Sequence, residues 1–177
     1  YMMQVSFAML GHLRGGPAKV AVVSSGLNGL ISGSSVSNVV SGGIFTIPLM
    51  KKAGYGGVKA GAIETASSVN GQIMPPVMGA AAFLMIEFLN VPYQTIIAAA
   101  VVPAFMHFFG VFMQVHFEAK RFGLRGLTEE EMPKLRQSLR ERWPTLIPLV
   151  LLISILGSGR TPYLAAFSGI TSCAIVG

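Results

Sequence analysis

Small polar residues gather in two otherwise apolar segments of this chain, and their side chains are of types that can hold an ion. The first polar segment is SGSSVSN, residues 32–38, with Ser32, Gly33, Ser34, Ser35 and Asn38. The second polar segment is SSVNGQIMPP, residues 67–76, with Ser67, Ser68, Asn70, Gly71, Gln72, Pro75 and Pro76. Neutral hydroxyl and amide oxygens, together with backbone carbonyls, suit Na⁺ better than a transition metal. The alternative is that these serines only pack helices together inside a membrane.

Other chemistries find little support in the sequence. The single cysteine, Cys173, excludes an internal disulfide and a cysteine metal cluster, so no cofactor is expected besides Na⁺ as a coupling ion. An intramembrane serine hydrolase would use Ser34 or Ser35 as its nucleophile. Its base would be His107 or His116, within hydrogen-bond reach of the serine, but the sequence offers no oxyanion-hole element. We therefore do not expect an enzyme.

Composition places the chain in a membrane. Hydrophobic residues make up 52% of the 177 residues and charged residues only 11%, whereas soluble domains carry about a quarter charged residues. The uncharged runs 20–50, 65–86 and 88–117 all reach the roughly 20 residues that a helix needs to cross a bilayer core. Basic residues flank these runs and form no patch with aromatic platforms for nucleic acid. The expected fold class is an all-α integral membrane protein.

The run 20–50 has a length that fits neither one nor two crossings. One straight helix of its 31 residues would be about 46 Å long, whereas two full crossings need about 40 residues. The first polar segment lies at its centre, where Gly33 lets the backbone approach a ligand closely. We therefore expect two half-length helices that meet around Ser32 to Asn38, as a re-entrant hairpin over residues 18–52. Such a turn at membrane depth must be enclosed by protein or line a water-filled cavity.

A second interruption is expected in the second polar segment. Pro75 and Pro76 remove backbone donors and push Met74 away from helical geometry, and Gly71 loosens the helix before them. The sequence predicts a broken helix over residues 58–89, with half-helices at 58–69 and 76–89.

The chain divides into five expected parts. Residues 1–14 end a membrane helix, and residues 15–91 hold the hairpin and the broken helix. Residues 92–119 form a transmembrane helix, 120–143 a basic cytoplasmic loop with an interfacial helix at 127–142, and 144–177 further transmembrane segments. The chain starts at Tyr1 and ends at Gly177 inside an apolar stretch, so we expect an internal piece of a longer protein.

Charge predicts the orientation in the membrane. The loop 120–142 contains seven basic and four acidic residues, whereas the turn at 88–95 contains no basic residue. Two crossings, through the broken helix and back through 93–119, place the basic edges on one side. By the positive-inside rule this side is cytoplasmic, so the hairpin opens from the cytoplasm.

Two runs in this order resemble one transporter family. They are GGPAKVAVVSSGLNGLISGSSVSNVVSGGIFTIPLMKKAGY and ETASSVNGQIMPPVMGAAAFLM, which are similar to the large membrane subunit of TRAP (tripartite ATP-independent periplasmic) transporters. More narrowly, the chain resembles the fused permeases paired with TAXI-type binding proteins, in which the small and large membrane subunits are one chain. The resemblance covers nearly the whole chain and is strongest from Gly15 to Pro92.

The resemblance implies a function and partners. It implies one half of an inverted-repeat, elevator-type transporter, with a hairpin and a broken helix in each half and Na⁺ and substrate held between the halves. The expected activity is Na⁺-coupled secondary uptake of an organic anion, such as a carboxylate, delivered by a periplasmic TAXI-type solute-binding protein. The expected location is the cytoplasmic (inner) membrane of a bacterium or archaeon, in a multi-pass arrangement. A channel is an alternative, but its filter would be a ring of equivalent segments, which a long asymmetric chain does not offer.

Glu64 is the one acidic residue close to a polar segment. We expect it near the cytoplasmic interface, paired with Lys59 or with a basic foot of the hairpin. The alternative is a coupling carboxylate, because ionisable residues inside membranes are often functional. His107 and His116 lack a partner cluster, and we expect them to pack within the scaffold.

Overall fold

Helices are the only regular secondary structure in the part that the computed structural model describes, which is all residues except 1, 125, 127–146, 159 and 177. The helices are α1 (Met2–Leu10), α2 (Gly16–Ser32), α3 (Ser35–Lys52), α4 (Gly57–Ile73), α5 (Ala80–Leu89), α6 (Tyr93–Arg121), α8 (Ile147–Gly157) and α9 (Pro162–Val176). The all-α fold class is therefore confirmed for these residues. The interfacial helix expected at 127–142 lies outside them.

The helices α2 and α3 form a hairpin with a two-residue connection. Gly33 adopts a left-handed conformation (φ 57°), which a residue without a Cβ does at little cost, and its N–H donates to the carbonyl of Gly29. Ser34 then caps α3, because its side-chain oxygen accepts a hydrogen bond of 3.3 Å from the N–H of Ser37. The turn thus falls within the stretch that the sequence predicts.

The helices α4 and α5 are separated by the α4–α5 linker, residues 74–79. Met74 has extended geometry (φ −74°, ψ 115°), as expected for a residue before proline. The expected bounds of 58–69 and 76–89 differ from those observed. Helix α4 continues to Ile73 because Met74 still donates to the carbonyl of Asn70 at 2.9 Å, and α5 begins only after Gly79 donates to the carbonyl of Gln72 at 2.7 Å.

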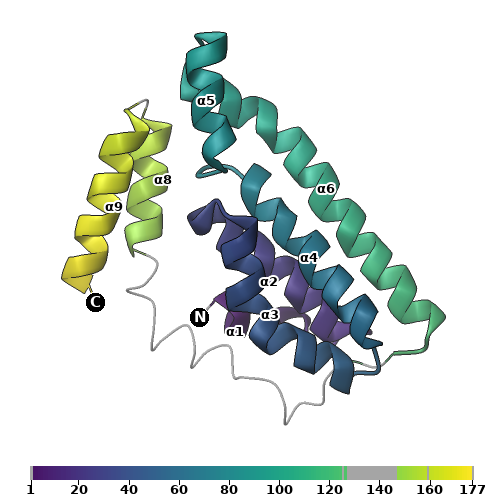
Figure 1. Cartoon of the computed structure of the whole chain (residues 1–177). Helices are drawn as coiled ribbons and strands as arrows, with labels where there is room; N and C mark the ends of the chain where they lie inside the picture. Colours follow the sequence, from purple (N-terminus) through teal and green to yellow (C-terminus); the bar gives the residue numbers. More distant parts are fainter. Residues whose placement is uncertain (1, 125, 127–146, 159, 177) are drawn as a thin grey trace.

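A first apolar cluster holds the hairpin to α4 and α6. It joins Ala18, Ala21 and Val22 of α2 with Met50, Tyr55, Ala60 and Val115. In Figure 1 the helices α2, α3 and α4 form one bundle, and α6 runs along its side. Small residues allow close packing here: a Cβ added to Gly29 of α2 would lie 2.6 Å from the Cα of Gly71 in α4.

A second apolar cluster lies at the other end of α4. It joins Met78, Ala82, Tyr93 and Ile96 with Leu156 of α8 and Ala165 of α9. The rings of Phe83 and Tyr93 stack with centroids 5.4 Å apart. The Tyr93 hydroxyl lies 2.8 Å from the carbonyl oxygens of Pro76 and Val77, so the start of α6 positions the α4–α5 linker.

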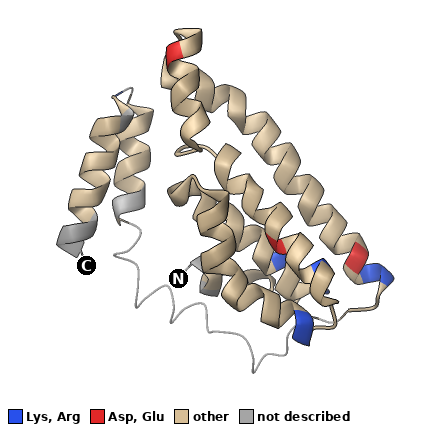
Figure 2. Ribbon diagram, viewed as in Figure 1, with Lys and Arg blue, Asp and Glu red and all other residues tan. Residues whose placement is uncertain are grey.

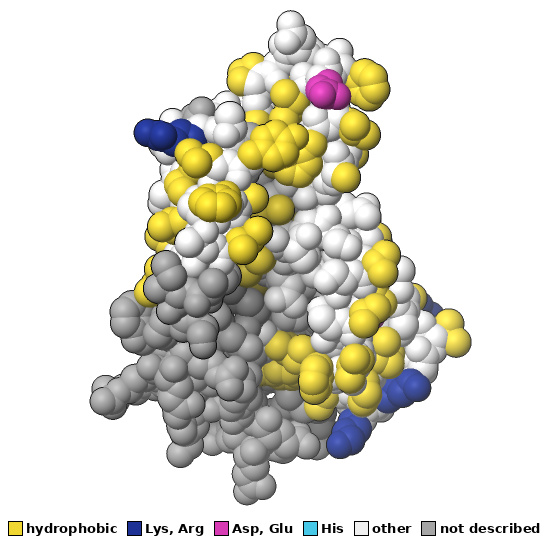
Figure 3. All heavy atoms as spheres, turned by 60° about the vertical axis from the view of Figure 1, so that its left-hand side comes forward, with side chains coloured by type: hydrophobic (Ala, Val, Ile, Leu, Met, Phe, Trp, Pro, Cys, Tyr) yellow, Lys and Arg dark blue, Asp and Glu magenta, His cyan; other side chains and the backbone are white. Residues whose placement is uncertain are grey.

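The helix α6 is long and apolar enough to cross a membrane. It has 29 residues, and its most apolar window has a mean hydropathy of 2.1 and is 17% buried. Within the described residues it is the one helix that meets these criteria of length and composition. Large hydrophobic side chains are exposed elsewhere too, including Phe88 and Tyr163, and Figure 3 shows them over much of one face. Contact with lipid or with further protein would cover them.

Most exposed charged side chains of the described helices lie toward the helix ends, whereas Glu64 is buried in the middle of α4. Lys51 and Lys52 are in the last turn of α3, and Lys120 and Arg121 are in the last turn of α6. Figure 2 shows these two helix ends at the same end of the molecule, with an acidic side chain of α5 at the opposite end. This distribution agrees with the one-sided basic edge inferred from the sequence.

Candidate functional site

The two polar segments meet in the structure. Gln72 of α4 donates from Nε2 to the hydroxyl of Ser35 at 2.9 Å, across 37 positions of sequence. A Cβ added to Gly33 would lie 2.1 Å from the carbonyl oxygen of Met78, and one added to Gly71 would lie 2.5 Å from Nδ2 of Asn38. Glycine at both positions is therefore required for the hairpin turn to approach the broken helix this closely.

Asn38 ties the hairpin together. It is 1% exposed, and its Oδ1 accepts a hydrogen bond of 3.1 Å from the Ser32 hydroxyl. Its Nδ2 donates at 3.1 Å to the backbone carbonyl of Ser25, in the opposite helix of the hairpin. Both ends of the amide are thus used within the hairpin, so Asn38 acts as a structural tie.

Asn70 differs from Asn38 in having no partner. It is 2% exposed, and neither Oδ1 nor Nδ2 finds a hydrogen-bond partner among the described residues. Its neighbours are satisfied: the Ser67 hydroxyl donates to the carbonyl of Ile63 at 2.6 Å, and the Ser68 hydroxyl lies 3.4 Å from Oε1 of Glu64. A buried amide without partners costs about 1–3 kcal/mol, so an ion, a water or a ligand group at this position would satisfy it.

Four helix ends meet where the two polar segments join. The helices α2 and α4 end at Ser32 and Ile73, and α3 and α5 begin at Ser35 and Ala80. Carbonyl groups at helix C-termini favour a cation, and N–H groups at helix N-termini favour an anion. The junction of the two polar segments therefore offers groups for both kinds of ion. Of the other expected site residues, Ser34, Pro75 and Pro76 are partly exposed there.

An apolar cavity of about 380 Å³ borders this junction on the side of α6. Pro75 lines it, together with Leu30 of α2 and Phe105 and Phe108 of α6. These side chains provide no oxygen ligands, so the cavity gives the junction an apolar wall.

Glu64 is buried between α3 and α4. Its Oε2 accepts a hydrogen bond from the Thr46 hydroxyl, and Oε1 faces Ser68. The expectation that Glu64 pairs with Lys59 is wrong, since Lys59 pairs with Glu118 of α6. The reason is helical geometry: residues five apart lie on faces separated by about 140°. Among the described residues Glu64 is held by hydroxyl groups and not by a cation, as a carboxylate buried away from water must be held by some polar group.

The histidines lie away from the polar segments. The His107 ring nitrogen Nε2 lies 3.1 Å from the carbonyl of Ala66, and the His116 ring packs edge-on against Phe117. The hydroxyls of Ser34 and Ser35 instead contact Ser37 and Gln72. Nothing in this geometry assembles a serine–histidine pair. The described part of the chain also contains no group of three or more His, Cys, Asp or Glu that could hold a metal.

Sequence reasoning overlooked two residues that shape the site. Thr46 holds Glu64, and the small residues Gly42 and Gly43 on the same helix make room for that carboxylate. Tyr93 holds the linker from a helix that begins some 17 residues later. The Gly-Gly-x-x-Thr spacing in α3 is a signal that could have indicated a small polar face.

A helical hairpin whose turn meets the break of an interrupted helix is an arrangement typical of helical membrane transport proteins. The chain matches over residues 1–177 the family described as "Tripartite ATP-independent periplasmic transporter, DctM component", and it belongs to this family. The family is one of transporters, which agrees with the expectation that the chain is not an enzyme.

Two curated relatives give the same assignment. The chain is 25% identical over 160 residues to the "Sialic acid TRAP transporter large permease protein SiaM" of Vibrio cholerae, covering 90% of this chain and 37% of the relative. It is 23% identical over 169 residues to a "Putative TRAP transporter large permease protein" of Haemophilus influenzae, covering 89% of this chain and 40% of the relative. The chain thus spans about two fifths of the length of these relatives.

Proposed function

We propose that this chain is one half of the transport domain of a TRAP permease that takes up an organic anion together with Na⁺. In this proposal α2 and α3 form a re-entrant hairpin open to the cytoplasm, and α4 and α5 form the broken helix. An inverted second half completes the site and moves with the first as an elevator. A periplasmic binding protein of the TAXI type delivers the substrate, the small subunit is fused to the same chain, and the protein lies in the inner membrane.

The observation that carries the proposal is the buried Asn70 of the second polar segment, whose amide has no hydrogen-bond partner among the described residues. A fully buried amide with two unused hydrogen-bonding atoms supports a bound cation or ligand at that place. The surrounding oxygen atoms are neutral hydroxyls, amides and carbonyls, a set that favours Na⁺. The single nearby carboxylate, Glu64, is one helical turn and a half away along α4 and is occupied by hydroxyl groups.

The anion side of the proposal depends on the helix N-termini. The first turns of α3 and α5 direct backbone N–H groups toward the junction. Among the described basic residues, the lysines of α3 and α4 lie at the opposite ends of those helices, so helix dipoles are the groups that would receive a carboxylate. The relative named for sialic acid supports an organic acid as the substrate class.

The decisive experiment is uptake by the intact transporter in proteoliposomes, with its binding protein and with or without an inward Na⁺ gradient. Asn70→Leu removes the free amide and keeps a side chain of similar size. It should weaken Na⁺ activation roughly 5- to 150-fold, the factor that corresponds to about 1–3 kcal/mol. Ser154→Leu is the matched control, because Ser154 is exposed on α8 and bonds within its own helix at 2.7 Å.

Two outcomes would count against the proposal. Wild-type uptake and wild-type Na⁺ dependence in Asn70→Leu would mean that the junction only packs helices. Na⁺ flux that needs neither substrate nor binding protein would instead indicate a channel.

A further inference from the structure

A groove of about 570 Å³ runs between α4 and α6, away from the junction of the polar segments. On α4 its walls are Lys59, Ala62, Ile63 and Ala66, which share one helical face. On α6 the lining residues extend from Val111 to Arg121. The contact of His107 with the carbonyl of Ala66 at 3.1 Å links the two helices beyond the groove's apolar end.

The groove is charged at one end and mainly apolar along the rest, where Gln114 of α6 is the polar lining residue. Lys59, Glu118 and Arg121 lie where α4 begins and α6 ends, and Ile63, Ala66 and Val111 lie toward the opposite end. The eleven residues from Val111 to Arg121 span ten helical steps, a rise of about 15 Å. This is half of a bilayer core about 30 Å thick, so the groove has the length of one leaflet.

The charge at the polar end is positive on balance. Lys59 pairs with Glu118, which leaves Arg121 as a cation in the groove without an ion-pair partner among the described residues. The Lys59 side chain is 49% exposed, and an ammonium group has three donors, so it can bind a second anion. The Phe122 ring holds both cations near each other through cation–π contacts. The Lys59 Nζ lies 4.0 Å and the Arg121 guanidinium carbon 5.7 Å from its ring centroid.

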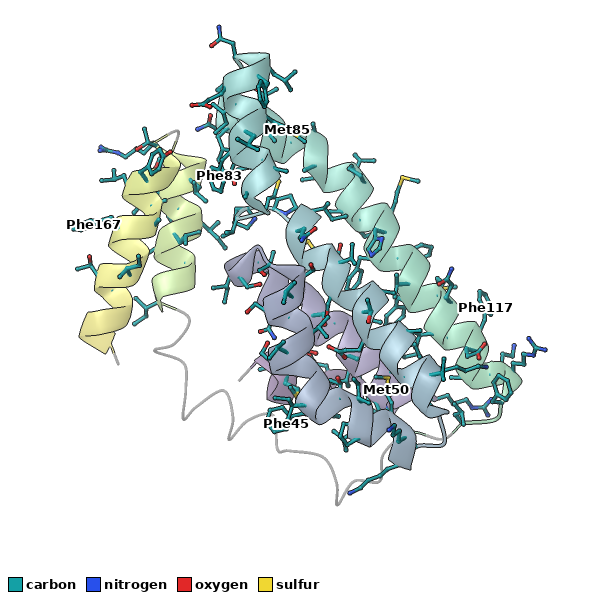
Figure 4. All side chains as sticks on the ribbon, in the orientation of Figure 1. Phe45, Met50, Phe83, Met85, Phe117 and Phe167 are labelled. Carbon is teal, nitrogen blue, oxygen red and sulfur yellow. The ribbon has the colours of Figure 1, made fainter. Side chains whose placement is uncertain are left out.

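We propose that this groove binds an anionic phospholipid of the leaflet at the basic end, with one acyl chain between α4 and α6 and the phosphate between Lys59 and Arg121. Basic pockets between membrane helices on the cytoplasmic side are typical sites for anionic headgroups. Phe117 lines the outer edge of the groove and points away from the bundle, where a second acyl chain would lie (Figure 4). The inference requires that α6 crosses the bilayer, and it is independent of the coupling ion.

The test uses the delipidated intact transporter and native mass spectrometry with phosphatidylglycerol or phosphatidylcholine. The wild type should retain phosphatidylglycerol in preference to phosphatidylcholine. Arg121→Gln should weaken phosphatidylglycerol binding about fivefold, the effect of one basic contact. Lys120→Gln removes the same charge from the neighbouring position outside the groove and should have no such effect.

A second pair of variants tests the acyl chain separately. Ala62→Phe places a ring in the groove and should abolish retention of the lipid, whereas Ala99→Phe adds the same ring to an exposed position of α6 outside it. A phosphatidylglycerol with a photoreactive acyl chain should crosslink to residues 62–66 and 111–117. The proposal would be overturned if the wild type retained the two lipids equally or if Ala62→Phe bound lipid as the wild type does. It would also be overturned if the groove residues crosslinked to another segment of protein, because that segment would then fill the groove.

Discussion

Asn38 and Asn70 have the same side chain, are buried to the same degree and lie in neighbouring polar segments, yet they have opposite roles. Asn38 joins the two helices of the hairpin through Ser32 and Ser25. Asn70 makes no hydrogen bond within the described chain. A buried polar residue whose hydrogen bonds are all made within the protein stabilises the fold, whereas one without partners is available to bind a ligand.

This difference predicts opposite effects on stability. Asn38→Leu should lower the melting temperature of the purified transporter, because it removes two hydrogen bonds and costs about 1–3 kcal/mol. Asn70→Leu should leave the melting temperature in Na⁺-free buffer unchanged or higher, since it removes an unsatisfied buried amide. Thermal melting in detergent measures both.

Added Na⁺ should then separate the two variants. A bound ion stabilises the folded protein by mass action, so Na⁺ should raise the melting temperature of the wild type and of Asn38→Leu but not of Asn70→Leu. An equal loss of stability in both variants without Na⁺ would show that Asn70 has a protein partner.

At the scale of the helices, contact between glycines sets how the hairpin meets α4. A Cβ at Gly71 would lie 2.5 Å from Nδ2 of Asn38 and 3.3 Å from the Cα of Gly29. These atoms belong to α3 and α2, and the backbone of Gly29 cannot yield as a flexible side chain can. The close approach of α2, α3 and α4 therefore depends on the absence of a Cβ at Gly71.

Gly71→Ala should consequently destabilise the protein by about 1–3 kcal/mol, the usual cost of overpacking a core. Gly61→Ala is the matched control in the same helix, since a Cβ there meets nothing within 4 Å. Alanine is also the better helix former, by up to about 1 kcal/mol, so Gly61→Ala should be neutral or stabilising. Denaturation monitored by circular dichroism compares the two, and equal effects would contradict the packing argument.

For the whole molecule, charge and apolar surface agree on one orientation. The basic ends of α3 and α6 lie together (Figure 2), and α6 leads from that end to the turn at Asn90. Lys51 and Asn90 are both exposed, at the two opposite ends. From the positive-inside rule we therefore expect the basic end on the cytoplasmic side.

Cysteine labelling of intact cells measures this orientation. In a background without other reactive cysteines, Lys51→Cys should react with a membrane-impermeant reagent only after the cells are opened. Asn90→Cys should react from outside. Labelling of both positions from the same side would contradict two crossings by the broken helix and α6.

The sequence by itself predicted the features that depend on local chemistry. Gly33 in a Gly/Ser-rich centre indicated the hairpin turn, and Pro75 and Pro76 indicated the interruption after α4, because the backbone limits of glycine and proline act within a few residues. The hydropathy of residues 93–119 likewise predicted α6. The bounds of α4 and α5 were less accurate, since hydrogen bonds such as that of Gly79 to Gln72 decide where each helix stops.

The tertiary structure alone decided which polar groups have partners. Lys59 pairs with Glu118, which is 59 positions away, and Glu64 is held by Thr46 on another helix, so the expected pairing of Glu64 with Lys59 is replaced by two contacts that no local spacing indicates. Asn70 has no partner in the described part of the chain for the same reason: whether a buried amide is satisfied depends on the helices packed against it. Residue types limit what a site can bind, but packing between distant segments selects which of those residues remains available.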